Sequence, residues 1–151
     1  MQTFLPLPDY QASAEVLDNK RLGKQRVEAM QILKALLSEY EGTKYGWKNH
    51  PATRMWKGHA LSLSNYGILV CVEWKGRGFQ DTCSQKISDL RLKLIKHESS
   101  FVPPDWFGDK AFHESHQSNL LRKLPSHYLK FGWQVDASLD YVWPQPRVEG
   151  K

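Results

Sequence analysis

The sequence predicts an all-α protein: a compact, single-domain, orthogonal arrangement of helices followed by a long irregular carboxy-terminal segment. The 151 residues suit one domain of ordinary size. Apolar residues recur at three- and four-residue steps, and no stretch alternates long enough to require a β-sheet. A hydrophobic fraction of 40%, with six tryptophans, is sufficient for a packed interior. We therefore expect residues 1–151 to form one domain.

A long first helix is predicted over residues 13–40. This stretch is rich in Leu, Ala, Lys, Glu and Gln and contains no proline. Ser13 is its candidate amino-terminal cap, and Gly42 lies just past its end. Gly23 in the middle of the helix marks a kink or a close backbone approach.

Three further helices are expected along the rest of the chain. Pro51 suits the first turn of a helix over residues 52–76, because its missing N–H would be unpaired there in any case. The third helix, over residues 84–96, is strongly amphipathic, and the fourth covers residues 110–124. The tail from about residue 125 is expected to be irregular and anchored by aromatic side chains.

The distribution of charge favours an anionic partner. The net charge is +5, and no Asp or Glu occurs in residues 42–72. Within that range, cations alternate with aromatic and histidine residues. They are Lys44, Lys48, Arg54 and Lys57 among Tyr45, Trp47, His50, Trp56 and His59. Cations neutralise phosphates and aromatic rings stack on bases, so the pattern indicates a nucleic-acid surface.

Several classes of protein are disfavoured by what the sequence lacks. No window approaches the ~20 apolar residues of a membrane span, and the amino terminus does not resemble a secretory signal. Cys71 and Cys83 form no CxxC pair, which favours reduced thiols in a cytoplasmic protein. Phosphate-binding and dinucleotide-binding glycine loops and a GxSxG elbow are absent, so we expect no organic cofactor.

The segment LDNKRLGKQRVEAMQ sets one carboxylate among several cations. Arg21, Gln25 and Glu28 are spaced i, i+4 and i+7, so they share one helix face. In a functional interpretation, Glu28 transfers protons or stabilises a cationic sugar-like transition state. Neighbouring basic residues would then hold phosphates. The alternative is a solvated helix face with i, i+4 ion pairs, and the spacing leaves both interpretations open.

The segment WKNHPATRMWKGH joins a turn, a helix start and a cation-aromatic cluster. Asn49 and His50 precede Pro51, where free N–H groups of a helix amino terminus can border a phosphate site. Alternatively, Asn49 only caps the helix and His50 only bonds within the core. Trp47, in a loop, is the expected DNA contact, and Trp56 is the expected core residue.

The segment FHESHQSNLLRK carries two histidines but no predicted metal site. His113 and His116 are spaced i, i+3, whereas helical metal pairs are usually i, i+4, and no third ligand has a suitable spacing. A functional interpretation is a helix end at which Arg122 and Lys123 contact phosphates. The alternative is a polar surface.

Together these segments resemble the pyrimidine-dimer DNA glycosylase family, that is, phage endonuclease V-like enzymes. The resemblance spans roughly residues 1–130. It depends on the order and spacing of Leu17-Asp18, Arg26 with Glu28, Asn49-His50-Pro51 followed by Trp56, and EWKGRGF at residues 73–79. It implies a helical enzyme that binds duplex DNA, kinks it and displaces a base at the lesion.

The resemblance also implies a mechanism in which the terminal α-amine attacks the sugar C1′ to form an imine, assisted by a helix glutamate. These roles fall on Met1 and Glu28. An unperturbed α-amine has a pKa of about 8 and is partly neutral near pH 7, unlike a lysine, whose pKa is about 10.4. The sequence departs from the family pattern at Gln2, which is large enough to retain Met1, and at Val27, where an arginine is usual.

The sequence therefore predicts a monomeric, cytoplasmic enzyme that excises a damaged or modified pyrimidine from duplex DNA without a metal, with an AP-lyase step as a further expectation. The alternatives are a non-catalytic DNA-binding module and a same-fold enzyme acting on another modified base or nucleotide. The candidate catalytic residues are Met1 and Glu28. The candidate DNA-binding residues are Lys20, Arg21, Lys24, Arg26, Trp47, Lys48, Asn49, His50, Arg54 and Lys57.

Overall fold

The computed structural model describes residues 1–144, and all regular structure in that range is helical. The predicted all-α class is therefore confirmed. In chain order the helices are α1 (Tyr10–Val16), α2 (Asn19–Glu41), α3 (Pro51–Arg54), α4 (Ala60–Gly76), α5 (Cys83–Leu94), α6 (Lys110–Lys123), α7 (Pro125–Tyr128) and the 3-10 helix η1 (Leu129–Phe131).

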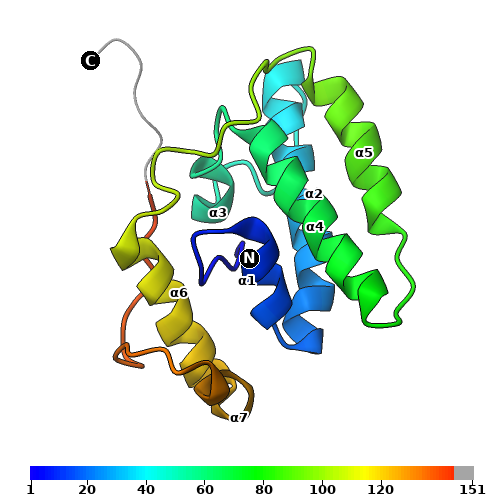
Figure 1. Ribbon diagram of the computed structural model, residues 1–151. Helices are drawn as coiled ribbons and strands as arrows, with labels where there is room; N and C mark the ends of the chain where they lie inside the picture. The colour runs from blue at the N-terminus through cyan, green and yellow to red at the C-terminus, as the bar shows by residue number, and fades with distance from the viewer. Residues whose placement is uncertain (145–151) are drawn as a thin grey trace.

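Two groups of helices enclose the amino-terminal arm. Helices α2, α4 and α5 pack on one another, and α1 packs on α4. Helix α6 lies apart from these three and continues into α7 and η1 (Figure 1). The arm before α1 runs between α6 and the α2–α4 pair, so contacts from both groups fix its course.

The prediction of one helix over residues 13–40 is wrong, because the chain breaks at Leu17 and Asp18. Leu17 is extended, and the Asp18 side chain accepts a hydrogen bond from the Arg21 N–H at the start of α2. Asp9, rather than Ser13, caps α1. At the other end of α2 the prediction holds, since Gly42 adopts the left-handed conformation (φ 71°) that ends a helix.

The prediction of one helix over residues 52–76 is also wrong. Pro51 does start a helix, but α3 lasts four residues and the chain turns at Gly58, which has a φ of 82°. Helix α4 then begins at Ala60. The third and fourth predicted helices are confirmed as α5 and α6 within two residues at each end. The predicted irregular tail from residue 125 is wrong at its start, because α7 begins directly at Pro125 and η1 follows; the irregular part that the structure describes covers residues 132–144.

Small residues allow the helices to approach closely. A Cβ atom on Gly23 would lie 2.9 Å from the Trp74 ring, so a close approach, one of the two predictions for this glycine, is confirmed. On α4, a Cβ on Gly67 would lie 3.0 Å from Ile87 of α5. A larger side chain at either glycine would force the Trp74 ring or the Ile87 side chain to shift.

The core contains both cysteines as buried free thiols, and burial raises the pKa of the Cys71 thiol to about 12. Within residues 1–144, no helix is long and apolar enough to cross a membrane.

Candidate active site

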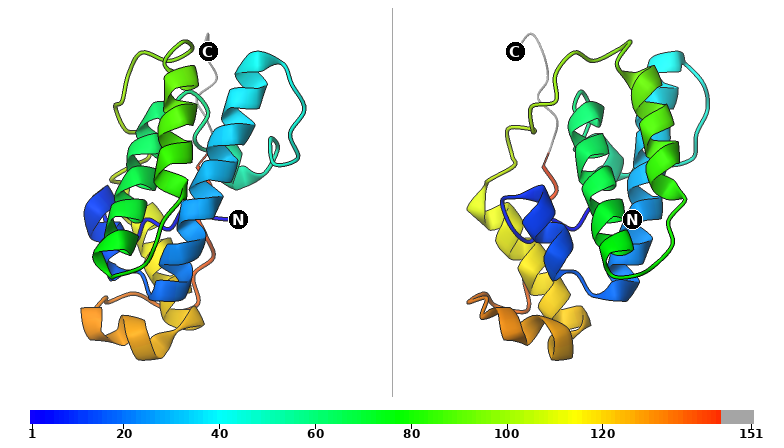
Figure 2. Two further views of the ribbon diagram at one scale, coloured as in Figure 1. Left: turned by 90° about the vertical axis from the view of Figure 1, so that its right-hand side faces the viewer. Right: turned by 45° about the vertical axis from the view of Figure 1, so that its right-hand side comes forward.

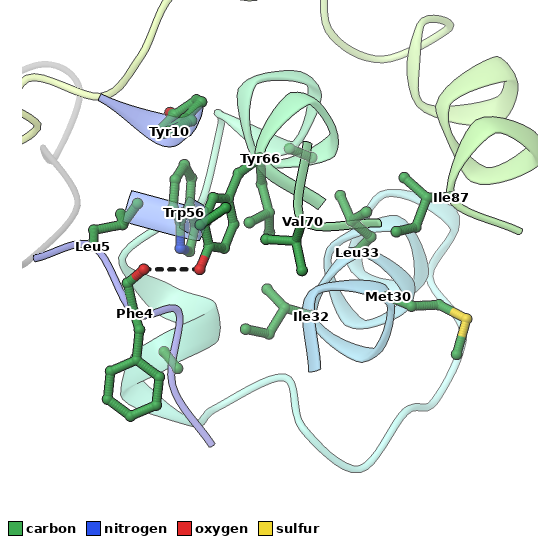
Figure 3. Packing of buried hydrophobic residues seen from close by; sticks show 14 of the residues in the cluster. Phe4, Leu5, Tyr10, Met30, Ile32, Leu33, Trp56, Tyr66, Val70 and Ile87 are labelled. Carbon is green, nitrogen blue, oxygen red and sulfur yellow. Dashed lines mark hydrogen bonds between the residues drawn. The ribbon is translucent and has the colours of Figure 1, made fainter. Parts of the chain in front are cut away.

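The amino-terminal arm is buried, although its first residue is partly exposed. Residues 2–6 are all buried, and the arm contacts the core through backbone and side-chain hydrogen bonds. Trp56 Nε1 donates to Thr3 Oγ1 at 3.1 Å, and the Tyr66 hydroxyl lies 2.8 Å from the Phe4 carbonyl oxygen (Figure 3). Such anchoring fixes the direction in which Met1 leaves the core.

Gln25 is the hub of these contacts. Its Nε2 donates to the Gln2 carbonyl oxygen at 2.8 Å and to Glu28 Oε2 at 2.9 Å. Its Oε1 accepts from the Phe4 N–H at 2.9 Å and lies 2.8 Å from the Tyr66 hydroxyl. Both N–H groups of the amide and its oxygen therefore have partners, and the single Tyr66 hydroxyl hydrogen is shared between Gln25 Oε1 and the Phe4 carbonyl oxygen. One buried side chain on α2 thus ties the arm to Glu28.

Two histidines of α6 hold the arm from the opposite side. His116 Nδ1 accepts from the Leu5 N–H at 3.0 Å, and His113 Nδ1 lies 2.7 Å from the Leu5 carbonyl oxygen. His113 Nε2 accepts from Gly108 N–H, so in the neutral ring Nδ1 carries the proton and donates to Leu5. Both rings are buried, so the sequence-based interpretation of this segment as a polar surface is wrong.

Burial lowers the pKa of both histidines. For His116 the nearby His113 adds to the effect, and the pKa falls to about 3. For His113 a hydrogen bond to Leu5 and the charge of Asp109 partly offset burial. Both rings are therefore neutral in the folded protein at neutral pH.

We expect the protein to lose stability as the pH falls below about 6.5. The unfolded chain binds a proton at His116 near pH 6.5, whereas the folded chain does so only near pH 3, so acid favours unfolding between these values. At pH 5.5 the free energy of unfolding should be about 1.4 kcal/mol lower than at pH 7.5 from this residue alone. Urea unfolding at the two pH values measures the difference.

His116→Asn supplies the matched variant, because its amide oxygen can accept from Leu5 but does not titrate. It should lose most of the His116 contribution to the pH dependence, whereas His97→Asn, on an exposed ring, should retain it. An unchanged pH dependence in His116→Asn would show that other groups cause the acid sensitivity.

The arm and α2 form one wall of a pocket of about 310 Å³. It brings together five of the residues predicted for the site, and the carboxy-terminal part of the chain supplies two more side chains. The lining residues are Met1, Gln2, Phe4, Lys20, Arg21, Lys24, Gln25, Glu28, Lys123 and Tyr141. An amino terminus and a carboxylate thus face one cavity surrounded by cations.

If Glu28 only belonged to a solvated helix face, it would be expected to form an i, i+4 ion pair, and within residues 1–144 it forms none. Arg21 pairs instead with Asp18, at 3.2 Å, and the ion pairs within residues 1–144 include neither Glu28 nor the Met1 amine. Glu28 Oε2 accepts from Gln25 and, at 3.4 Å, from the Gln2 N–H. The carboxylate is therefore held in place by neutral donors.

His50 lies near the amino terminus. Its Nδ1 accepts from the Ala52 N–H as the cap of α3, so His50 caps this helix and the alternative in which Asn49 does so is wrong. Burial and the positive Met1 amine both lower the pKa of His50. Trp47 and Asn49 are exposed on the same loop, and Trp47 has 42% of its surface accessible. The left view of Figure 2 shows this loop on the same side of the molecule as the amino terminus.

The remaining predicted DNA contacts already have partners within the protein. Arg26 pairs with Asp81 at 2.6 Å and lies over the Trp74 ring. Although burial opposes ionisation, hydrogen bonds from Arg26 and two N–H groups hold the pKa of Asp81 at about 2. Arg54 and Lys57 both form ion pairs with Glu39 of α2. Lys48 donates a hydrogen bond to the Thr43 carbonyl oxygen in its own loop.

Sequence reasoning missed half of the pocket. It places Gln25 on the correct helix face but not in the site, and the spacing of Gln25 from Glu28 could have suggested a role. The sequence suggested Lys123 only as a phosphate contact at a helix end, not as part of this pocket. Gln2, Phe4 and Tyr141 had no local signal, because the tertiary path of the chain brings them to α2. Within residues 1–144 we find no group of three or more His, Cys, Asp or Glu residues suited to a metal ion.

The protein is all-helical, and its buried arm brings a terminal amine and a carboxylate into one basic pocket. These features define a class of small enzyme that acts on an anionic substrate. The family comparison agrees: the family described as pyrimidine dimer DNA glycosylase matches residues 1–87. The chain belongs to this family, and it is a DNA-repair glycosylase of the pyrimidine-dimer type in the general sense. No curated protein and no solved structure matches. Helix α6 and the segment carrying Tyr141 lie beyond the matched residues.

Proposed function

We propose that the protein, acting as a monomer, excises a damaged pyrimidine from duplex DNA with the Met1 amine as nucleophile and Glu28 as the proton-transfer group. One observation carries this proposal: the anchored arm delivers Met1 into the same pocket as Glu28. Ordering the arm costs conformational entropy, and its hydrogen bonds to α2, α4 and α6 offset this cost and fix where its end lies.

The chemistry follows from these two groups. The neutral amine attacks C1′ of the damaged nucleotide, the C1′–N bond breaks, and the base leaves with the bonding electrons. The amine then loses a proton, the C1′–O4′ bond opens as O4′ gains a proton, and a protonated imine remains. Glu28 stabilises the positive charge at C1′ and accepts protons from the amine.

The proposed lyase step uses the same carboxylate. Glu28 removes a proton from C2′ of the imine, and the electrons expel the 3′ phosphate by β-elimination. Both strand cleavage and base release therefore depend on one glutamate and one amine. The proposal assigns the nucleophile to the α-amine of Met1, which the large Gln2 side chain is expected to leave in place.

Basic side chains at the mouth of the pocket are the proposed phosphate contacts. Lys20, Lys24 and Lys123 are exposed, line the pocket and form none of the ion pairs found within residues 1–144. Arg26 is not included, because Asp81 and Trp74 hold it in place. Its contribution is to link α2 with the start of α5.

We expect DNA affinity to fall steeply with salt and to depend on these lysines. Each phosphate contact contributes a slope of about −0.9 to log affinity against log salt concentration. Lys24→Ala should therefore make the slope shallower by about 0.9 and weaken binding equally for all sequences. Fluorescence anisotropy over a salt series measures both.

Lys93→Ala on α5, outside the pocket lining, is the control and should leave the slope unchanged. Equal slopes for the unsubstituted protein and Lys24→Ala would remove Lys24 from the DNA surface.

Borohydride trapping on duplex DNA with an abasic site tests the proposal. Reduction of an imine leaves a covalent protein–DNA adduct, so the unsubstituted protein should be trapped and protein with an acetylated α-amine should not. A non-catalytic DNA-binding module would bind the duplex but give no adduct. An enzyme acting on another modified base would give the adduct yet release no base from dimer-containing DNA.

A further inference from the structure

A second pocket, of about 470 Å³, lies between the start of α1, the side of α4, Arg91 of α5 and the loop that follows α5; we refer to it as the Arg91 pocket. Most of its wall is apolar and consists of Pro8, Tyr10, Ile68, Leu69, Pro103 and Phe107. Phe101 and Val102, which directly precede Pro103, are exposed and extend this apolar surface. The Arg91 pocket therefore suits a large apolar side chain.

Neutral acceptors hold the Arg91 guanidinium in place. Its Nε donates to Ser64 Oγ at 2.9 Å, and its Nη2 donates to Asn65 Oδ1 at 2.7 Å. The Phe101 ring lies under the guanidinium, with its centroid 5.5 Å from Cζ. Among the hydrogen bonds found within residues 1–144, none uses Arg91 Nη1. The orientation of the guanidinium is thus fixed while one of its nitrogen atoms has no acceptor.

Arg91 also forms none of the ion pairs found in the part of the chain that the structure describes. Its side chain is partly buried, and burial lowers the pKa of the guanidinium. A cation held partly out of water is usually paired with an anion, because the pairing offsets the cost of desolvation. Asp9 lines the same pocket, but its Oδ2 accepts from the Ala12 N–H at 2.8 Å as the cap of α1. The anion that suits Arg91 is therefore one that a ligand brings.

The Arg91 pocket is separate from the candidate active site. The two pockets share no lining residue. In the left view of Figure 2, α1 and the loop between α5 and α6 lie on the side of the molecule away from the amino terminus. A duplex bound at the Met1 pocket would leave this face open. An apolar wall is also a poor surface for a phosphate backbone, so the ligand of the Arg91 pocket is not DNA.

We propose that the Arg91 pocket binds the carboxy terminus of a partner protein whose last residue is large and apolar. The terminal side chain would fill the apolar wall, and the terminal carboxylate would accept from Arg91 Nη1 in a charge-assisted hydrogen bond. A peptide terminus also carries amide N–H groups beside its carboxylate, and these suit the Asp9 side chain. A small free acid has no such donor and would only be repelled by Asp9.

Short peptides with a single charge test this assignment. The probe is acetyl-SGSF with a free carboxylate, and isothermal titration calorimetry measures its affinity for the unsubstituted protein. The same peptide with a carboxy-terminal amide should bind about tenfold more weakly or worse, because the hydrogen bond to a charged acceptor is lost. The isomer acetyl-FSGS keeps the charge but ends in serine. It should also bind at least about tenfold more weakly, because its apolar side chain is not at the terminus.

Two variants and a control locate the site. Arg91→Gln should lower the affinity for acetyl-SGSF about tenfold or more. Ile68→Glu retains Arg91 and its bonds to α4 but places a carboxylate in the apolar wall, so it should have the same effect even if Arg91→Gln loosens the packing of α5. Lys96→Gln, on an exposed side chain outside the pocket lining, should bind like the unsubstituted protein. Urea unfolding of each variant establishes that it is folded.

Four results would overturn the inference. Equal affinity for the free acid and the amide would exclude capture of a carboxylate. Binding of 3-phenylpropionate as tight as that of the peptide would make the ligand a small free acid rather than a protein terminus. Unchanged affinity in the folded variants would place the peptide elsewhere, and competition by duplex DNA would place it on the DNA-binding surface. None of these measurements requires base release, so failure of the proposed function leaves the outcome readable.

Discussion

Glu28→Gln should lower the rate of base release by a factor of about a hundred or more while DNA affinity is retained or rises. Glutamine keeps the shape and an acceptor oxygen, so Gln25 and the Gln2 N–H retain their hydrogen-bond partner. It cannot accept a proton, and it offers no full negative charge to the cationic centre at C1′. Single-turnover base release and equilibrium binding, measured on the same duplex, separate these two effects.

The structure also limits the effect of this substitution on stability. Glu28 has no ion pair within residues 1–144, so Glu28→Gln should change the free energy of unfolding by less than about 1 kcal/mol. Glu41→Gln, at the exposed end of the same helix, is the matched control and should leave base release unchanged. Normal turnover in Glu28→Gln would exclude this glutamate from the chemistry.

Trp56→Ala should destabilise the fold by about 3–5 kcal/mol. The indole is fully buried and packs edge-on against Trp106 at 5.0 Å, so its removal leaves a large cavity. It also removes the hydrogen bond to the Thr3 hydroxyl that anchors the arm. Urea unfolding measures the loss, and the folded fraction should also be trapped less efficiently because Met1 is less firmly placed.

Trp47→Ala is the contrasting variant on the neighbouring loop. The Trp47 side chain is exposed, and the ring contact found for it within residues 1–144 is an edge contact with His50 at 5.8 Å. Its removal should leave the unfolding midpoint unchanged and weaken DNA binding. If Trp47→Ala unfolded the protein and Trp56→Ala did not, the roles given to the two tryptophans would be reversed.

The helical class and the approximate positions of α5 and α6 could be predicted from periodicity and composition. The breaks inside the two longest predicted helices could not. At Leu17 no proline or glycine interrupts the pattern, and the chain leaves the helix there because Asp18 caps a new one. Tertiary packing decides such a break, since Tyr128 donates to Asp18 from the other end of the chain.

The candidate site also has a part that the sequence predicts and a part that it does not. The spacing of Arg21, Gln25 and Glu28 on one helix was sufficient to place Glu28 among cations. The anchoring of Leu5 by His116 joins residues 111 positions apart, and helix periodicity carries no information on such a pairing. Local composition also cannot distinguish a free cation from one paired with a distant acid, as Arg26 and Asp81 show.

Peptide mapping of the borohydride-trapped complex tests the central claim most directly. After trapping on abasic DNA and digestion of both protein and nucleic acid, mass spectrometry locates the residue that carries the reduced sugar. The account predicts the adduct on the α-nitrogen of Met1, in the peptide that begins MQTFLPLPDY. An adduct on Lys20 or Lys24, which line the same pocket, would contradict it and make a lysine the nucleophile.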